Sequence, residues 1–271
     1  MNKQKKLKYI QNLTLHEVTN IKSKNFLVKL RFYEILYEMI LSGTIRNKRE
    51  IYYLDVNIFK SQKVVDGLIK KTCLEMNETP FSLNITNTLK GIFQGSVTFY
   101  SKDKQYTLGA TVSLIPDMNR IEKVTTTKLY CLVLEKDTIF SKAVRQLTHP
   151  EVFLLVCGKG YPCKNTQLFL SKVKIPIIGL FDYDPYGLDI FLKYSAVCDI
   201  TRIGLDGDDI QYIPQDQHIE FKANDHKRMK LIKTNSLTSR EAFKMEELGV
   251  KVELESVFDR CNVFDYIKNK L

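Results

Sequence analysis

The spacing of apolar residues changes along the chain, and the change divides it in two. Apolar side chains in residues 26–41 recur at the spacing of one helical face, and Gly43 follows as a terminator. Residues 46–59 predict a short helix and a loop. Residues 61–76 return to the helical spacing behind Ser61, a candidate N-cap, and predict a helix of about 15 residues. The first part of the chain is therefore expected to be mainly helical.

A different pattern follows these helices. Residues 83–103 alternate between apolar and polar positions and carry Gly91 and Gly95, which predicts a small β-hairpin. Helices followed by a short hairpin are typical of a winged helix-turn-helix, a common DNA-docking module.

From about residue 128 the chain alternates between strand and helix patterns. Buried strands are predicted at 129–135, 152–158 and 175–182, with helices between and after them and a fourth strand at 200–205. This alternation predicts a mainly parallel sheet that is covered on both faces. Further on, Thr238 and Glu241 fit a capping box that opens a helix ending near Gly249. The polar segment 116–127 is the expected boundary between the two halves.

The charge of the chain favours a polyanionic partner. Its 41 Lys and Arg residues outnumber its 31 Asp and Glu residues, for a formal net charge of +10. Nucleic acid and an anionic membrane surface both fit this balance, and so does a merely soluble basic protein. The sequence holds no run near the ~20 apolar residues of a membrane span, so no membrane partner is expected. Lys3, Lys5 and Lys6 fit a frayed, solvated end better than a nuclear address, and the absence of an apolar stretch behind them argues against a secretory signal.

Soft-metal chemistry is not indicated. The six cysteines are scattered without a CxxC pair, several of them in apolar runs, which favours free thiols over a zinc site. The four histidines show no metal-ligand spacing.

Three acidic residues follow predicted parallel strands. Glu135 ends the first strand, and Asp182 and Asp184 follow the third in the sequence GLFDYDPYG. The carboxyl ends of such strands share one edge of a sheet, where ligands bind. Carboxylate oxygens there would suit Mg²⁺, with Mn²⁺ as a substitute. A solvated Asp-Pro turn is the competing interpretation for Asp182 and Asp184.

A family resemblance rests on these acids together with four other motifs. A Glu after one strand and Asp-x-Asp after a later one is the signature of the Toprim domain, and it stands here beside GKGYP at 158–162 and RIGL at 202–205. Upstream stand KREIYY at 48–53 and LKGIFQGSV at 89–97. In this order and spacing, from about residue 30 to about 260, the chain resembles the A subunit of topoisomerase VI, and most of all its eukaryotic relatives that make meiotic double-strand breaks.

This resemblance implies an α/β protein with two domains. It implies a short extension at residues 1–25, a CAP-like winged-helix domain at 26–118 with a nucleophilic tyrosine, and a Toprim domain with a mainly parallel sheet at 128–271. It also implies a nuclear, type IIB topoisomerase-like transesterase that acts as a homodimer on double-stranded DNA. Topoisomerase VI B-like or other accessory meiotic proteins are the further partners it implies.

Residue roles follow from the same resemblance. The family nucleophile matches Tyr53, with Tyr52 as the alternative, and a Tyr hydroxyl can displace the 3′-oxygen of a phosphodiester to leave a 5′-phosphotyrosyl bond. This exchange needs no nucleotide cofactor, and GKGYP lacks the full phosphate-loop pattern. Arg49 matches the basic residue beside the nucleophile and would clamp the scissile phosphate. Glu135, Asp182 and Asp184 match the metal ligands.

Four further basic residues are candidate DNA contacts, each with a plain structural alternative. Arg46 and Lys48 also fit a solvated helix face, Lys90 an ordinary lysine of the wing, and Lys159 a Gly-rich turn. Two other functions stay open at this point. One is an ATP-coupled topoisomerase VI A subunit that reseals DNA with a B subunit, and the other is a DNA-binding module without catalysis.

Overall fold

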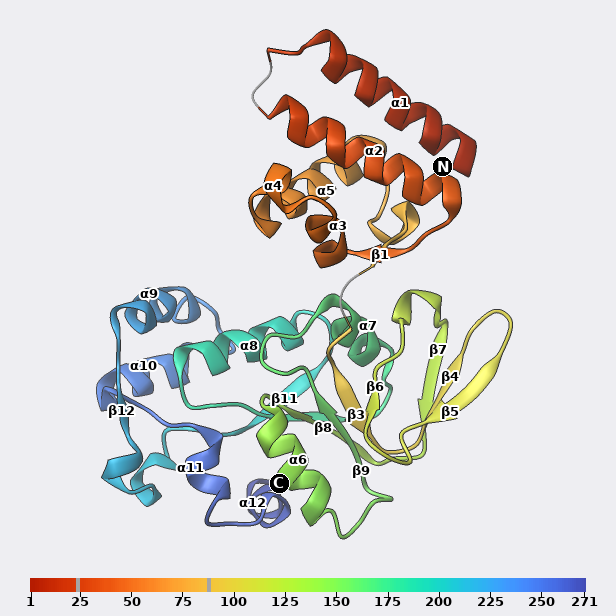
Figure 1. The fold of residues 1–271 in the computed structure, drawn as a ribbon. Coiled ribbons are helices and arrows are strands. Elements are labelled where there is room, and N and C mark those ends of the chain that lie inside the picture. Colours follow the sequence, from red (N-terminus) through yellow and green to blue (C-terminus); the bar gives the residue numbers. More distant parts are fainter. Residues whose placement is uncertain (23–24, 87–88) are drawn as a thin grey trace. The chain divides into compact units, whose positions relative to one another are not determined.

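The computed structural model describes residues 1–22, 25–86 and 89–271, which form two compact units, Met1–Thr88 and Leu89–Leu271 (Figure 1). Each unit has its own core. The division falls earlier than the boundary predicted at 116–127, because residues 89–118 pack with the second unit. The predicted winged-helix range 26–118 is therefore split between the units, and its residues 87–88 lie outside the described residues.

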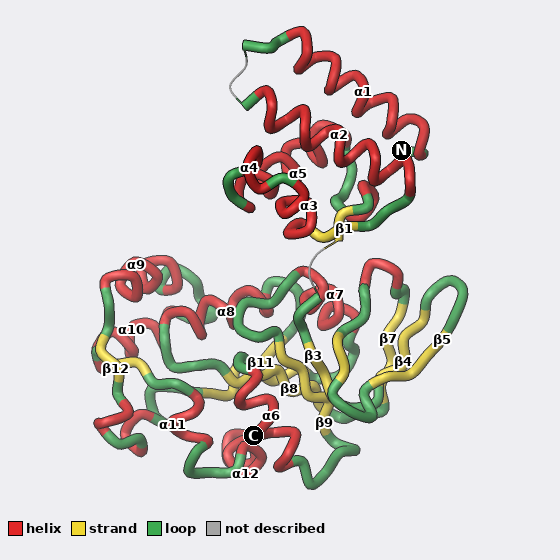
Figure 2. Tube along the Cα trace, in the orientation of Figure 1, coloured by secondary structure: helices red, strands yellow, loops and turns green. Residues whose placement is uncertain are grey.

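The first unit is built almost entirely of helices (Figure 2). Its helices are α1 (Lys3–Thr19), α2 (Phe26–Ser42), α3 (Lys48–Leu54), α4 (Val56–Phe59) and α5 (Gln62–Met76). Two short strands, β1 (Arg46–Asn47) and β2 (Ile85–Thr86), pair in parallel. The predicted helices at 26–41 and 61–76 are confirmed. Gly43 ends α2 with a φ of 76°, which glycine adopts without strain.

The N-terminal segment is an ordered part of this unit. The lysine-rich start is predicted to be a frayed, solvated end. Lys3 and Lys5 are exposed, but the end is not frayed, since α1 begins at Lys3, packs along α2 and fully buries Ile10. Lys3 and Lys6 donate hydrogen bonds to the carbonyl oxygens of Leu41 and Ser82. The expected extension 1–25 thus contributes a helix to the core of the first unit.

The predicted hairpin at 83–103 does not form in the described part of that segment. Instead β3 (Ile92–Gln94) joins the main sheet of the second unit, antiparallel to β9 (Phe153–Cys157) and β6 (Ser113–Leu114). The next strand, β4 (Val97–Tyr100), lies in another sheet between β5 (Gln105–Leu108) and β7 (Lys123–Thr126). Burial explains the difference, because the Phe93 side chain is fully buried against Phe169 in the core of the second unit.

The main sheet has the strand order β11-β10-β8-β9-β3-β6. Its parallel part consists of β8 (Tyr130–Leu134), β9, β10 (Ile177–Leu180) and β11 (Ile200–Gly204). The expected parallel-rich α/β arrangement is confirmed. Every strand in this part runs in the same direction, so the segments that follow β8, β10 and β11 share one edge of the sheet.

Helices cover both faces of this sheet (Figure 1). The side chains of β8 alternate between the faces: Leu132 and Leu134 pack with α6 (Asp137–Gln146), whereas Cys131 and Val133 pack with α7 (Lys164–Lys172) and α8 (Pro185–Ser195). This burial on both faces accounts for the continuous apolar runs in the sequence.

The C-terminal segments complete the α6 face. They comprise β12 (Ile219–Glu220), α9 (Ala223–Ile232), α10 (Ser239–Leu248), β13 (Val250–Lys251), α11 (Leu254–Phe258) and α12 (Val263–Lys270). The helix predicted between Thr238 and Gly249 is confirmed, but its capping box is not formed: the Thr238 hydroxyl donates to the Ile232 carbonyl, and Glu241 accepts from the Gly207 amide. Among the described residues, every helix is too short or too polar to cross a membrane.

Candidate active site

The segment KREIYY forms α3, a short helix with a well-defined start. The Asn47 side chain accepts hydrogen bonds from the amides of Arg49 and Glu50, and the Glu50 carboxylate accepts from the Asn47 amide. This reciprocal capping box satisfies amides that would otherwise lack partners at the helix start. Ile51 is buried and anchors the helix in the core. The surface side chains of α3 are thereby held on a fixed support.

The two tyrosines of α3 differ in exposure. Tyr53 is 68% exposed, whereas Tyr52 packs partly buried against the core of the first unit. Arg49 is also exposed and stands four residues before Tyr53, on the same helical face. A phosphate group that reached Tyr53 could therefore also meet a guanidinium.

The other two basic candidates of this segment are tied to the fold. Nζ of Lys48 lies 3.1 Å from Oδ1 of Asp66. Arg46 lies in β1, and its amide donates to the Asn84 carbonyl. Both side chains are half-buried, in contrast to that of Arg49.

The acidic residues of the second unit lie at the carboxyl edge of the parallel strands. Leu134 of β8 pairs with Leu180 of β10, so the residues that follow these strands are neighbours. The amide of Asp182 donates a 3.0 Å hydrogen bond to Oε2 of Glu135. Both carboxylates are buried, Glu135 at 6% and Asp182 at 4% exposure.

Asp182 is held from two sides. Its Oδ1 accepts a 2.8 Å hydrogen bond from the Leu254 amide, and its Oδ2 lies 2.9 Å from Nζ of Lys136. Lys136 also reaches Glu253 and Glu255, at 3.4 and 2.9 Å. A buried carboxylate needs such partners, because burial without them is strongly unfavourable.

Asp184 has a structural role in addition to any chemical one. It is the N-cap of α8, where its Oδ1 accepts from the amide of Gly187, and Pro185 occupies the first turn. Gly187 is required here, since a Cβ at that position would lie 2.3 Å from the Asp182 carbonyl oxygen. The turn chemistry of DPYG thus sets the direction of Asp184.

Burial raises the pKa of all three acids, and repulsion from the neighbouring acids of this edge adds to it for Glu135 and Asp182. Burial, followed by the negative charge of Asp182, raises the pKa of Glu135. Burial likewise raises the pKa of Asp182 against the opposing effect of Lys136, and raises the pKa of Asp184. A further positive charge at this edge would relieve these costs.

Comparison with known proteins gives the family of the chain. The sequence profile for the Toprim domain of Spo11 and of the topoisomerase 6 A subunit matches residues 130–271, more than half of the chain. The profile "Type IIB DNA topoisomerase" matches residues 24–85. The chain belongs to the family of Spo11 and the topoisomerase 6 A subunits.

Individual relatives agree with this family. A probable meiosis-specific SPO11 homolog from Encephalitozoon cuniculi is 34% identical over 93% of this chain and 90% of its own length. The mouse meiotic recombination protein SPO11 is 27% identical over 86% of this chain and 67% of its own length. The meiotic recombination protein spo-11 of Caenorhabditis elegans is 35% identical over 59% of this chain and 39% of its own length.

Toprim domains typically bind divalent metal ions, and the acidic edge of this Spo11-family chain can be tested for such a role. Its donors are carboxylate oxygens, which suit hard cations, and burial raises the pKa of each carboxyl group, a cost that a bound cation would offset. Within residues 1–22, 25–86 and 89–271, no three His, Cys, Asp or Glu side chains are arranged to hold a metal together. The donor set fits a divalent cation, but in this arrangement Lys136 lies against Asp182.

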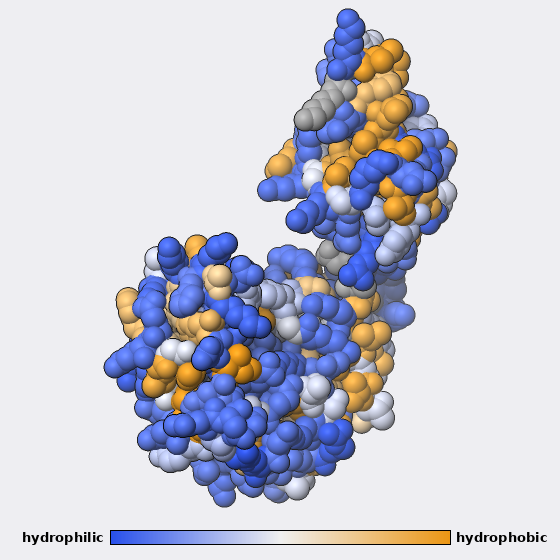
Figure 3. All heavy atoms as spheres, turned by 60° about the vertical axis from the view of Figure 1, so that its left-hand side comes forward, coloured by the Kyte–Doolittle hydropathy of each residue, from blue (hydrophilic) through white to orange (hydrophobic). Residues whose placement is uncertain are grey.

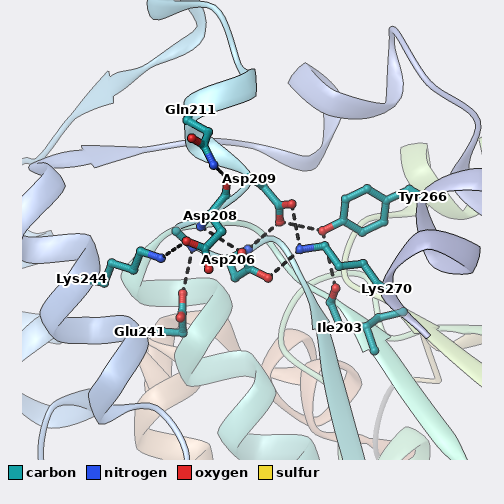
Figure 4. Close-up of polar contacts among 10 residues, drawn as sticks. Ile203, Asp206, Asp208, Asp209, Gln211, Glu241, Lys244, Tyr266 and Lys270 are labelled. Atoms are coloured by element: carbon teal, nitrogen blue, oxygen red, sulfur yellow. Dashed lines mark hydrogen bonds and ion pairs between the residues drawn. The ribbon is translucent and has the colours of Figure 1, made fainter.

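A second acidic group follows β11 at the same edge, and it is already paired (Figure 4). Lys270 lies 2.7 Å from Asp206 and 2.8 Å from Asp209, and the Tyr266 hydroxyl donates to Asp209. Lys244 pairs with Asp208. These contacts join the loop after β11 to α10 and α12, so this acidic loop serves the fold rather than a metal.

The GKGYP loop lies next to the acidic edge. The Gly160 amide donates a 2.8 Å hydrogen bond to the Glu135 carbonyl, and Lys159 has a φ of 56°. Nζ of Lys159 lies 3.3 Å from Asp137, and Nζ of Lys90 donates to the Lys159 carbonyl. Lys90 thus belongs to the second unit and not to a wing, while Lys159 keeps an exposed side chain.

Two features of the Spo11-family site were missed in the sequence. One is the contact of Lys136 with Asp182, since a lysine at a strand end fits a solvated turn equally well. The other is Asp189, a buried acid of α8 that accepts from the Tyr161 hydroxyl at 2.6 Å and from Arg228 at 3.0 Å. The helical spacing of α8 places Asp189 among apolar residues, and this is the signal that could have marked it.

Proposed function

We propose that this protein breaks both strands of DNA in meiotic recombination by transesterification. The observation that carries the proposal is that one Spo11-family chain holds both an exposed Tyr53 beside Arg49 in its first unit and a buried carboxylate edge in its second unit. The mouse and Encephalitozoon relatives are described by name as meiotic proteins, which supports the biological setting.

Tyr53 is the proposed nucleophile. Its hydroxyl oxygen forms a bond to a backbone phosphorus, the bond from that phosphorus to the 3′-oxygen breaks, and the 3′-oxygen takes up a proton as the phenol loses one. The product is a 5′-phosphotyrosyl end and a free 3′-hydroxyl. One phosphodiester is exchanged for another, so no nucleotide cofactor is required. Arg49 is proposed to hold the phosphate and stabilise its charge.

The acidic edge is proposed to hold Mg²⁺, or Mn²⁺ in its place, through Glu135, Asp182 and Asp184. A divalent ion there would neutralise the carboxylates and stabilise the charge that develops on the phosphate. Glu135 and Asp182 already lie together, and each is fixed by a main-chain amide, which limits the reorganisation that binding requires.

Lys159 and Lys90 are proposed to contact the DNA backbone beside this edge, with lesser contributions from Arg46 and Lys48. The second unit presents a largely hydrophilic face in Figure 3, whereas hydrophobic residues gather on the visible face of the first unit. The net charge of +10 favours a polyanion. A homodimer is proposed as the cleaving species because two strands must be cut. Topoisomerase VI B-like or other accessory meiotic proteins are the proposed partners, and the nucleus is the proposed location.

The decisive test is a search for the covalent intermediate. The protein is incubated with labelled duplex DNA and Mg²⁺ and then denatured. We expect DNA that stays attached to the protein through its 5′ ends and is released by protease. Double-strand ends without attached protein would instead indicate hydrolysis, and would contradict the transesterification.

A further inference from the structure

The cation position at Asp182 is filled by a side chain of this protein. Nζ of Lys136 lies 2.9 Å from Asp182 Oδ2, which is the oxygen that the Leu254 amide leaves open. On Glu135, Oε2 accepts from the Asp182 amide, and among the described residues no hydrogen bond reaches Oε1. A divalent ion that used Asp182 Oδ2 would therefore meet the ammonium group of Lys136 at the site.

The same lysine has a second set of partners ready. Glu255 Oε2 lies 2.9 Å from Nζ, and Glu253 Oε2 lies 3.4 Å from it. The other oxygen of Glu255 accepts a 2.7 Å hydrogen bond from the Thr138 hydroxyl, which holds that carboxylate in place. The Leu254 amide that binds Asp182 lies between these two glutamates. Lys136 can therefore leave Asp182 and keep two carboxylate contacts.

We propose that Lys136 is an internal placeholder for the metal: it occupies Asp182 in the metal-free protein and moves fully onto Glu253 and Glu255 when a divalent cation binds. This inference rests on the proposed metal site. It assigns Lys136 as a competitor of the metal and Glu255 as the acceptor that makes the exchange possible. Metal loading is then weaker than the carboxylates alone would give, and it depends on residues that do not themselves touch the ion.

Direct binding of Mn²⁺ tests this exchange without any reading of activity. The full-length protein is titrated with Mn²⁺, and the free ion is counted by electron paramagnetic resonance. Lys136→Met removes the competing charge, and we expect it to lower the Kd by roughly tenfold or more. Lys136→Arg keeps the charge and should stay near the wild-type value. Lys142→Met is the matched control, because Lys142 of α6 is likewise a lysine paired with a carboxylate, that of Asp259.

Glu255→Gln should act in the opposite direction. It removes one of the charges that would receive Lys136, so Mn²⁺ should bind more weakly. In the Lys136→Met background the same substitution should have no effect, because the lysine through which it acts is gone. A loss of affinity in both backgrounds would show that Glu255 contacts the metal, and would overturn its role as the acceptor for Lys136.

The outcomes separate this inference from the proposed metal site. Equal Kd values for wild type and Lys136→Met would overturn the placeholder role and leave the metal site standing. Weaker binding by Lys136→Met would show that the lysine orients Asp182, which also overturns it. If wild type and Lys136→Met both fail to bind Mn²⁺ while their thermal unfolding shows folded protein, the metal site itself falls. If Lys136→Met binds Mn²⁺ and the wild-type protein does not, the inference is supported most strongly.

Discussion

The rings of Tyr52 and Tyr53 lie 5.2 Å apart between centroids, yet they face different surroundings. Tyr53 is 68% exposed, whereas Tyr52 is partly buried against the core of the first unit. Adjacent helical residues point about 100° apart, so one phosphate can be reached by one of them at a time. The exposed ring is the one that the family resemblance also favours.

Replacing Tyr53 by Phe should abolish the covalent adduct. The substitution keeps the ring and removes the nucleophilic oxygen, so folding and DNA binding should be unchanged. Tyr52→Phe is the matched control and should retain adduct formation. Attachment to DNA is measured after denaturation, and the melting temperature is measured alongside. An adduct that persists in Tyr53→Phe and disappears in Tyr52→Phe would reverse the assignment.

The α/β half of the fold could be predicted because its strands are apolar on both faces. Residues 129–135, 152–158 and 175–182 could not face water on either side, which required covered parallel strands. The meeting of Glu135 with Asp182 followed from the same reasoning, since both come directly after such strands. The same reasoning did not predict where the Asp184 side chain points, because that is set by its hydrogen bond as the N-cap of α8.

Long-range pairing could not be predicted in the same way. The alternation in 92–100 indicated strands, but it did not say that β3 would join β9, some sixty residues along the chain. Lys136 likewise depends on Glu255, which is 119 residues away. Contacts between residues so far apart in the sequence are determined by the tertiary fold, so a local sequence pattern cannot predict them.

Arg49 should matter for catalysis more than for binding. Arg49→Ala should reduce adduct formation by about 10²-fold or more, as expected when a preorganised charge is removed from a developing anion. Duplex affinity should change by less than about tenfold, because one phosphate contact is a small share of the whole. Lys48→Met provides the comparison, since Lys48 already pairs with Asp66 and such surface pairs contribute little. Equal losses for Arg49→Ala and Lys48→Met would argue against a specific role for Arg49.

Binding to duplex DNA should weaken steeply with salt. Each neutralised phosphate contributes about −0.9 to the slope of log affinity against log salt concentration. Lys159→Asn should reduce the magnitude of this slope by about one, and Asn tolerates the left-handed backbone at that position. Lys128→Ala is the control, because Nζ of Lys128 already donates to the Pro150 carbonyl. A slope that Lys159→Asn leaves unchanged would remove Lys159 from the DNA contacts.

Glu135→Gln should separate stability from activity. Burial raises the pKa of Glu135, so its ionised form costs stability in the metal-free protein, and a neutral amide avoids that cost. We expect a melting temperature without metal at or above that of wild type. Adduct formation should fall by about 10²-fold or more, and added Mg²⁺ should no longer raise the melting temperature. A variant that unfolds early would contradict the stability argument, and one that cleaves normally in excess chelator would contradict the metal role of Glu135.

Mixing two inactive chains should show whether the nucleophile and the acidic edge come from different protomers. The family resemblance implies that Tyr53 of one protomer acts with the acids of the other. In a dimer of one Tyr53→Phe chain and one Glu135→Gln chain, the Tyr53 of the second chain then meets the intact acids of the first. That dimer has one complete site and should cut one strand, giving nicks with a single attached protein. If each chain used its own residues, both sites would be defective and the mixture would be inactive. Tagged chains purified through both tags ensure that mixed dimers are measured, so an inactive mixed dimer would exclude the shared arrangement.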